Sequence, residues 1–266
     1  MARKTKQNLL LTFIDMEKAY DNVARDILWP DLLHMLAPED QGILADILKM
    51  YEGLQASVIG GTGQNISITK GVKQGCPCSP LIFGMFFEQI ETWVNEAVNT
   101  FIEQDRVNKR HFLWKGRTRI DMLMFADDII ILTRTVHGAN VILAAMHDFC
   151  RTKGFKMNMG KGKTECIVMD RNGQLYSQPT TGNGITIPTT TRYKNLGVLI
   201  DGTGQDKANN EHTIQKSRKA FAKLSNEMRV EQWMAPAVKL TLLDTGVRAI
   251  MLYATATWTH KEIMTN

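Results

Sequence analysis

The chain has little cysteine and shows no pattern of metal ligands or disulfides. Its 266 residues include six histidines and four cysteines, Cys76, Cys78, Cys150 and Cys166. The cysteines form no C-x-x-C pair and the histidines lack metal-ligand spacing, so we expect neither structural zinc nor a disulfide framework. Such sparse cysteine in a long chain is typical of a reducing compartment.

Long apolar runs are missing too. No run approaches the ~18 residues that a membrane-spanning helix requires. The first apolar stretch, Leu9 to Ile14, follows basic residues but runs into Asp15, Glu17 and Lys18 without a small-residue cleavage site, unlike a secretory signal. We therefore expect a soluble, intracellular protein with no membrane partner, in the nucleus or the cytoplasm.

The composition is otherwise that of a folded enzyme-sized chain. Hydrophobic residues make up 44%, enough for a sizeable core, and the length suits one large domain or two small ones. Lysine and arginine number 32 against 27 acidic residues. This mild basic excess suits a polyanionic partner without requiring one, because many ordinary enzymes are as basic.

Hydrophobic periodicity predicts an α+β protein: a sheet with helices up to about Gly202, followed by a basic helical tail. The polar segment from Asp170 to Thr191 is the best candidate for an internal linker. The expected strands cover 9–14, 163–169 and 193–200, two strands within 119–134 joined across 126–128, and a hairpin over 54–72 with its turn at 60–63. The expected helices cover 23–36, 38–51, 79–98 and 138–153, and then the tail from about 211.

Two adjacent carboxylates, Asp127 and Asp128, interrupt the apolar run from Met122 to Leu132. At the tip of a strand–turn–strand they would project from a rigid base into one place. Two like charges at such a short distance repel each other unless a cation neutralises both. A hard cation such as Mg²⁺ does this, because it prefers oxygen ligands. The alternative is an ordinary charged turn, because aspartate is a common turn residue.

A third carboxylate, Asp15, ends the apolar strand Leu9 to Ile14. A strand-end aspartate beside a hairpin-tip aspartate is one way in which a sheet holds two metal ions about 4 Å apart. That arrangement suits phosphoryl or nucleotidyl transfer. It still leaves phosphatases, nucleases and polymerases open.

A glycine-containing loop precedes the helix that starts near Ser79 and Pro80. Gly75 in "GVKQGCPCSP" would let the backbone approach a flat ligand, and the helix N-terminus favours phosphates. Ser79 would be the N-cap and Pro80 would occupy the first turn. The alternative is a simple Gly-Pro loop before a capped helix.

Together, "FIDMEKAYD", "GVKQGCPCSP", "FADD" and "YKNLGV" resemble, in order and spacing, the palm of reverse transcriptases. The resemblance is closer to the non-LTR retrotransposon (LINE) class than to retroviral enzymes and covers about Leu9 to Trp258. It implies a palm over residues 1–202, an antiparallel sheet with helices packed on one face, and a partial helical thumb over 203–266. Group II intron and retron-type polymerases carry similar palm motifs and stay open as a third reading.

The resemblance implies an RNA-directed DNA polymerase. It would add dNTPs to a DNA primer on an RNA template, using two Mg²⁺ ions for which Mn²⁺ can substitute. Because only fourteen residues precede Asp15, the fingers are expected to be largely missing and the chain to be a fragment with weak or absent activity. The alternative is a truncated, inactive remnant that at most binds nucleic acid.

The resemblance also implies roles for the metal site and the nucleotide pocket. Asp15 and Asp127 would be the principal metal ligands, with Asp128 as the third carboxylate and the carbonyl of Met16 facing a metal. Tyr20 would block a ribose 2′-hydroxyl and so favour dNTPs. The floor of the nucleotide pocket would be lined by Gln74, Gly75, Ser79 and Pro80.

Further roles concern the triphosphate and the primer. In "GFKMNMGKGKTECIVM" a lysine after Asn158 would approach the triphosphate; one form of the motif selects Lys161, whereas the "KTE" part favours Lys163. Leu196 and Gly197 would form the primer grip. The basic tail residues that could follow a phosphate backbone are Lys216, Arg218, Lys219 and Lys223. Those four could equally be a solvated helix face.

Overall fold

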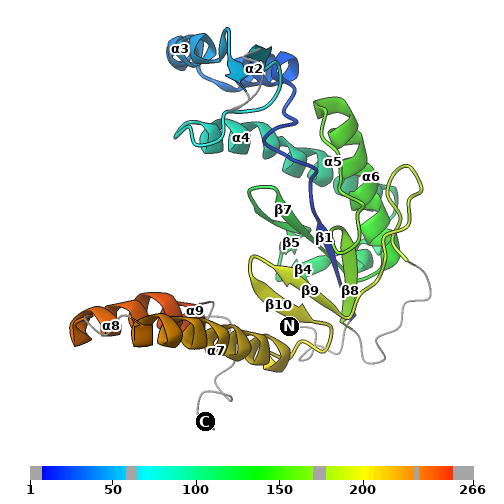
Figure 1. The fold of residues 1–266 in the computed structure, drawn as a ribbon. Coiled ribbons are helices and arrows are strands. Elements are labelled where there is room, and N and C mark those ends of the chain that lie inside the picture. Colours follow the sequence, from blue (N-terminus) through cyan, green and yellow to red (C-terminus); the bar gives the residue numbers. More distant parts are fainter. Residues whose placement is uncertain (1–7, 58–64, 170–177, 231–233, 254–266) are drawn as a thin grey trace.

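The protein is a mixed α+β structure arranged around one antiparallel sheet (Figure 1). This computed structural model describes residues 8–57, 65–169, 178–230 and 234–253. In Figure 1 the α2–α3 helices lie at the top, the sheet in the middle and helices α7–α9 at the lower left. The predicted α+β class with an antiparallel sheet is confirmed.

The central sheet has four strands in the order β6-β7-β1-β8, and every neighbouring pair is antiparallel. The strands are β1 (Leu9–Ile14), β6 (Met122–Phe125), β7 (Asp128–Thr133) and β8 (Glu165–Met169). The interior strand β1 is buried along almost its whole length, which explains why it reads as a continuous apolar run. The predicted strand over 9–14 is confirmed.

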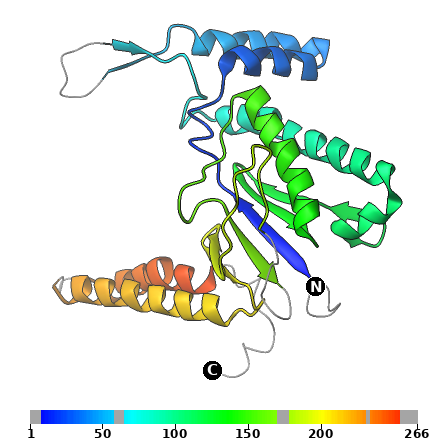
Figure 2. The same ribbon diagram turned by 90° about the vertical axis from the view of Figure 1, so that its right-hand side faces the viewer.

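Helices α5 (Gln89–Gln104) and α6 (Val136–Lys153) lie along one face of this sheet (Figures 1 and 2). They contribute to a large core with the inward residues of β1 and β7, among them Ile14 and Ile129. The helix α6 is defined by its ends: the Thr135 side chain accepts a hydrogen bond from the Gly138 amide, and Gly154 closes it with φ of 78°.

The opposite face of the sheet carries a small hairpin, β9 (Arg192–Asn195) and β10 (Val198–Asp201). Phe13 of β1 stacks on Tyr193 of β9, with ring centroids 4.1 Å apart. A second, smaller core of Leu11, Phe13, Leu132 and Ile167 lies beneath this contact. Because side chains alternate along a strand, Leu11, Phe13 and Asp15 all project from this face.

The remaining elements form three groups outside the central sheet. The first group comprises α2 (Arg25–Met35), η1 (Pro38–Asp40), α3 (Gln41–Tyr51), β2 (Gln55–Ser57), β3 (Asn65–Ser67) and α4 (Ser79–Phe87). The second comprises η2 (Arg106–His111), β4 (Leu113–Lys115) and β5 (Thr118–Ile120), and the third α7 (Lys207–Val230), α8 (Pro236–Leu243), the π-helical η3 (Asp244–Arg248) and α9 (Ala249–Leu252). None of the helices in the described part of the chain is both long and apolar enough to cross a membrane.

Four local expectations are wrong. The single strand expected over 193–200 is the β9–β10 hairpin, because the chain turns back at Leu196 and Gly197. The single helix predicted over 79–98 is divided at Glu88 into α4 and α5, and α5 continues to Gln104. Ser79 is the first residue of α4 rather than its N-cap, because its hydroxyl donates to the Lys73 carbonyl and accepts no hydrogen bond from the helix. The segment 119–134 contributes to three strands rather than two, since Arg119 and Ile120 belong to β5.

The linker predicted from Asp170 to Thr191 is wrong for residues 178–191. Ile187 is fully buried, and the Cys166 amide donates to the Pro188 carbonyl, so this segment packs along β8. Residues 170–177 of the predicted linker lie outside the described residues, as do the expected turn at 60–63 and the end of the expected thumb, 254–266.

Candidate active site

The register of the central sheet brings two of the predicted carboxylates face to face. Ile14 of β1 pairs with Ile129 of β7, so the next residues, Asp15 and Asp128, lie opposite each other. Cross-strand partners share a face of the sheet. Both aspartates therefore lie on the face that carries the β9–β10 hairpin.

Asp127 belongs to the tight turn between β6 and β7. Phe125 pairs with Asp128, which leaves only Ala126 and Asp127 in the turn. Ala126 has φ of 53°, a left-handed conformation that costs a residue with a Cβ. Strained backbone of this kind persists where the surrounding structure enforces it, and it is frequent at functional sites.

The three carboxylates share one electrostatic environment. Burial raises the pKa of Asp128 above its ordinary value, the negative charges of Asp127 and Asp15 raise it further, and Lys163 opposes the rise. Tyr193 lies close by: burial raises its pKa to about 12, with Asp15 and Asp128 adding to the effect. A cation placed among these groups would be stabilised by the same field.

Asp15 is held by the segment that follows α6. The side-chain amide of Asn158 donates to Asp15 Oδ2 at 2.7 Å, and the Asn158 backbone amide donates to the Asp15 carbonyl at 2.8 Å. Lys163 Nζ lies 3.4 Å from Asp15 Oδ1. The Thr164 hydroxyl accepts from the Asp15 amide at 3.4 Å. Both carboxylate oxygens and both backbone polar groups of Asp15 therefore have partners.

The position of Lys163 bears on the choice between two lysines. Its ammonium approaches Asp15, and its carbonyl accepts a hydrogen bond of 2.5 Å from the Tyr193 hydroxyl. Lys161 is exposed in the preceding turn, where Gly162 has φ of 75°. The geometry therefore favours Lys163.

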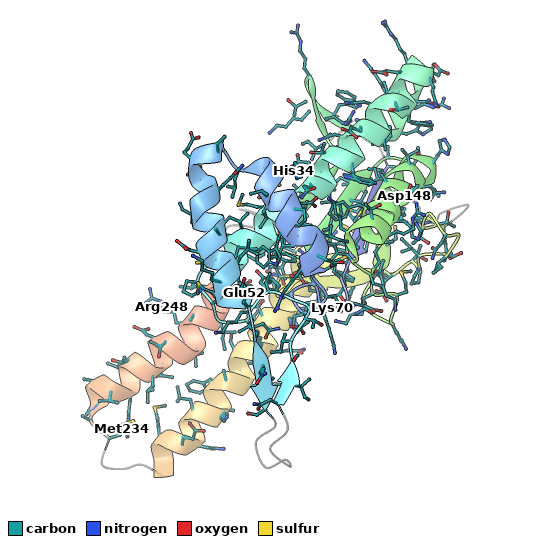
Figure 3. All side chains as sticks on the ribbon, turned by 90° about the horizontal axis from the view of Figure 1, so that it is seen from above. His34, Glu52, Lys70, Asp148, Met234 and Arg248 are labelled. Carbon is teal, nitrogen blue, oxygen red and sulfur yellow. The ribbon has the colours of Figure 1, made fainter. Side chains whose placement is uncertain are left out.

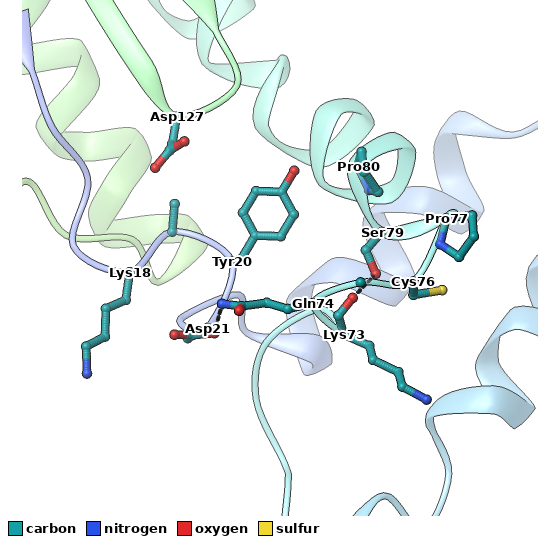
Figure 4. Close-up of a pocket in the computed structure, with 12 residues that line it drawn as sticks. Lys18, Tyr20, Asp21, Lys73, Gln74, Cys76, Pro77, Ser79, Pro80 and Asp127 are labelled. Carbon is teal, nitrogen blue, oxygen red and sulfur yellow. Dashed lines mark hydrogen bonds between the residues drawn. The ribbon is translucent and has the colours of Figure 1, made fainter. Parts of the chain in front are cut away.

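A pocket of about 530 Å³ lies beside the carboxylates (Figure 4). Its lining includes six of the predicted site residues, Tyr20, Gln74, Gly75, Ser79, Pro80 and Asp127, together with Lys18, Ala19, Asp21, Lys73, Cys76 and Pro77. Figure 4 shows the Tyr20 ring between Asp127 and the loop that carries Gln74. Elements that are distant in sequence thus form one concave surface.

Tyr20 is fixed by packing. Its ring stacks on Phe83, with centroids 4.4 Å apart, and its carbonyl accepts from the Val72 amide at 2.9 Å. Burial raises the pKa of Tyr20, with a further contribution from Asp127. The phenol is therefore neutral near pH 7 and presents its ring as a rigid wall of the pocket.

Gly71 allows the Gln74 loop to lie against the Tyr20 segment. Gly71 has φ of 80°, and a Cβ there would lie 2.9 Å from the carbonyl oxygens of both Tyr20 and Asp21. Only glycine fits such an approach. The loop is then secured by Gln74, which donates to Asp21 Oδ1 at 2.9 Å, and by Arg25, which donates to the Gly71 carbonyl at 2.7 Å.

The chemistry of the donors suits Mg²⁺, although the ligands are not gathered here. The Met16 carbonyl accepts no hydrogen bond from the described residues, which leaves a hard oxygen beside Asp15. Mutual repulsion among the carboxylates is what a cation would relieve. Among the described residues, no three His, Cys, Asp or Glu side chains already form a ligand cluster.

Leu196 and Gly197 form the two-residue turn of the β9–β10 hairpin, with φ of 46° and 81°. The Tyr253 hydroxyl, from the residue after α9, donates to the Leu196 carbonyl at 2.5 Å. A Cβ on Gly197 would lie 3.1 Å from the Tyr253 ring. The hairpin is therefore coupled to the C-terminal helices.

The four tail cations lie together on α7. Lys216, Arg218, Lys219 and Lys223 are all exposed, whereas Ser217 between them is buried. The structure thus leaves their charges at the surface. It does not bring them to the carboxylates, because α7 extends away from the sheet (Figures 1 and 2).

Comparison with known proteins decides the family. The profile of the family described as reverse transcriptase (RNA-dependent DNA polymerase) matches residues 1–200. The chain belongs to the reverse transcriptase family. Its relatives are Pol proteins of R2 non-LTR retrotransposons, which confirms the resemblance to the non-LTR class.

Two such relatives are each 24% identical to this reverse transcriptase chain. One is the retrovirus-related Pol polyprotein from type-2 retrotransposable element R2DM of Drosophila melanogaster, over 208 residues, 74% of this chain and 18% of the relative. The other is the Pol polyprotein from type-1 element R2 of Nasonia vitripennis, over 238 residues, 86% of this chain and 22% of the relative. The chain therefore spans about a fifth of their length.

Among solved structures, the chain is similar to a telomerase from Candida albicans in complex with a TWJ fragment of telomeric RNA. The two are 12% identical with a TM-score of 0.45, and the match covers 98% of this chain and 43% of the telomerase chain.

Several residues of this candidate site were missed in the sequence. Tyr193 and Thr164 reach the carboxylates through folding alone, and Asn158 was noticed only as a marker of the lysine motif. Lys18 lines the pocket and has φ of 43°. Its position three residues after Asp15 is a signal by which the sequence could have indicated it. Cys76 also lines the pocket, and a hydrogen bond from the Cys78 backbone is the main cause of its lowered pKa.

Proposed function

We propose that this chain carries the catalytic centre of an RNA-directed DNA polymerase, which adds dNTPs to a primer 3′ end on an RNA template. The observation that carries the proposal is the single pocket in which Asp127, Tyr20 and the Gln74–Pro80 loop meet, beside the facing pair Asp15 and Asp128. Family membership supports it. A pocket of this size accommodates a nucleotide.

The proposed domains follow the fold. Residues 1–202 would form the palm, with the catalytic carboxylates at the end of β1 and in the β6–β7 turn. Residues 203–266 would form a thumb, of which α7 to α9 are described. Lys216, Arg218, Lys219 and Lys223 would face the backbone of a bound duplex from α7.

In the proposed reaction the primer 3′-hydroxyl attacks the α-phosphorus of the dNTP, and pyrophosphate leaves. Asp15, Asp127 and Asp128, with the Met16 carbonyl, would hold two Mg²⁺ or Mn²⁺ ions, which supply charge stabilisation to the transferring phosphoryl group. Lys163 would give a proton to the leaving pyrophosphate. Asn158 keeps the Asp15 carboxylate oriented.

Pocket residues would select and align the nucleotide. The Tyr20 ring would collide with a ribose 2′-hydroxyl, because its stack on Phe83 prevents it from moving aside. Gln74, Gly75, Ser79 and Pro80 would support the base pair, and the Leu196–Gly197 turn would hold the primer end. Holding both reactants in one geometry supplies much of the rate in such reactions.

One observation favours the alternative, an inactive remnant that at most binds nucleic acid. Both oxygens of Asp15 already have protein partners, Asn158 and Lys163. A live site must exchange the Lys163 contact for a metal ion. The carboxylates alone do not establish that exchange.

Primer extension on poly(rA)/oligo(dT) with Mg²⁺ or Mn²⁺ separates the two. We expect dTTP-dependent extension that is lost in Asp127→Ala, since that side chain faces the pocket. If the wild-type chain is folded but extends no primer with either metal, the polymerase proposal is overturned and the inactive remnant is the remaining interpretation.

A further inference from the structure

A second basic region lies outside the candidate active site. The segment from Asp105 to Arg119 contains six basic residues and one acidic residue, a net charge of +5. The whole chain also carries +5, so the other residues sum to zero. Positive charge this concentrated is the usual electrostatic footprint of a polyanion partner.

The fold holds this segment rigidly. It forms η2 and the β4–β5 hairpin, in which Trp114 pairs with Arg119. Arg119 is largely buried and donates to Asp121 at 2.6 Å, to Asn99 at 2.6 Å and to Asn95 at 2.9 Å. This clamp secures the hairpin to α5, so the charges around it project from a fixed support.

The other five cations face solvent and have no acidic partner among the described residues. They are Arg106, Lys109, Arg110, Lys115 and Arg117. Two exposed cations elsewhere do have acidic partners: Lys49 lies 2.9 Å from Asp46, and Arg151 lies 3.7 Å from Asp148. A cluster of unpaired like charges is unfavourable unless a counter-charge binds it.

The surface is remote from the carboxylates. Phe112, just before β4, bridges to Thr133 at the far end of β7 from Asp128. Five residues of strand separate Thr133 from Asp128, about 17 Å. Figures 2 and 3 show the β4–β5 hairpin on the opposite side of the protein from helices α7–α9, so the two basic regions are separate.

We propose that η2 and the β4–β5 hairpin form a second nucleic-acid site, which binds the sugar–phosphate backbone through Arg106, Lys109, Arg110, Lys115 and Arg117. Contacts of this kind give affinity without base readout. One face of Trp114 is taken by Lys109, whose ammonium lies 5.7 Å from the ring centroid, and the indole donates to the Lys109 carbonyl. The site is independent of whether the carboxylates catalyse polymerisation.

The test compares two double variants of the full chain with the same loss of charge. Lys115→Gln/Arg117→Gln removes two hairpin cations, and Lys49→Gln/Arg151→Gln removes two exposed cations elsewhere. Binding of labelled oligo(U) RNA, and separately of a DNA duplex, is measured by fluorescence anisotropy over a range of salt concentrations. Urea unfolding of each variant verifies that the fold is kept.

We expect the hairpin variant to bind more weakly and the control to match wild type. The slope of log K against log salt should fall by about 1.4 on single-stranded RNA and about 1.8 on the duplex for two lost phosphate contacts. Whichever probe shows the larger loss identifies the preferred form. Equal losses in both variants, or none in either, would overturn the proposal.

Two further measurements separate this surface from a lipid-binding one and from the catalytic centre. Binding to vesicles that contain phosphatidylserine is measured in the same way. If the hairpin variant loses vesicle binding but keeps nucleic-acid binding, the surface binds lipid and the proposal is overturned. Primer extension by the hairpin variant on a short template should equal wild type. If no polymerase activity exists, the binding result still stands, so the two proposals fail separately.

Discussion

Asn158 donates two hydrogen bonds to Asp15. Its side-chain amide donates to Oδ2 at 2.7 Å, and its backbone amide donates to the Asp15 carbonyl at 2.8 Å. The Gly160 amide in turn donates to Asn158 Oδ1 at 3.1 Å, which fixes the orientation of the amide group. Asp15 is therefore held in one orientation by a residue that need not touch the substrate.

Asn158→Ala should weaken Mn²⁺ binding and primer extension by about 10- to 100-fold, the usual cost of removing a group that orients a metal ligand. Mn²⁺ binding is measured by electron paramagnetic resonance, so the prediction does not depend on activity. Asn108→Ala is the control, because its amide donates to the Phe101 carbonyl away from the site. Unchanged Mn²⁺ affinity in Asn158→Ala would contradict the positioning role.

Tyr20→Ala should admit ribonucleotides. Loss of the ring removes the wall beside Asp127, so the ratio of rNTP to dNTP incorporation should rise about tenfold or more, a range expected when a pocket gains this much space. Competitive single-nucleotide extension measures the ratio. Tyr20→Phe keeps the ring and should keep the wild-type ratio; a rise in that variant would point to the hydroxyl instead of the ring.

Acid should destabilise the packing of η2 against α6. His111 Nδ1 lies 2.8 Å from Thr135 Oγ1, and burial, followed by His137 and Arg110, lowers the pKa of His111 below its ordinary value. The unfolded chain therefore binds a proton more readily than the native one, so stability is lost as the pH falls below about 6.5.

Urea unfolding at pH 7.5 and pH 5.5, within the range where histidine titrates, measures this effect. His111→Asn should show a smaller difference between the two pH values than wild type. The exposed His34, substituted in the same way, should leave the difference unchanged. A wild-type chain that is equally stable at both values would contradict the assignment.

Gly197→Ala should destabilise the β9–β10 turn. The substitution forces alanine to φ of 81° and sets its Cβ 3.1 Å from the Tyr253 ring, which together should cost about 1–3 kcal/mol of unfolding free energy. Gly204→Ala is the matched control, because it imposes φ of 64° with nothing within 4 Å. Equal losses in the two variants would show that the contact with Tyr253 contributes nothing.

Local sequence was sufficient for the main strand, whereas six of the residues that line the pocket were expected from the family resemblance. Leu9–Ile14 reads as an interior strand because both of its faces are buried, and the apolar run through Asp127 reads as a hairpin for a similar reason. The predictions from local sequence failed where one element ends and the next begins. The division of one long helix at Glu88 and the burial of residues 178–191 both depend on contacts with distant elements, which periodicity does not report.

The sequence by itself indicated that Asp15 and Asp127 follow short apolar runs typical of buried strands. It also determined the residues of the pocket loop, because a glycine-containing turn before a helix is a local feature. Tertiary structure alone decided that Lys163 rather than Lys161 approaches Asp15 and that Asn158 orients it. It also decided that Arg119 is held by Asp121, Asn95 and Asn99, whereas the other five cations of η2 and the β4–β5 hairpin are exposed. The physical reason is distance: these relationships join residues far apart in the chain, and only the register of the sheet and the packing of the helices on it set how close they come.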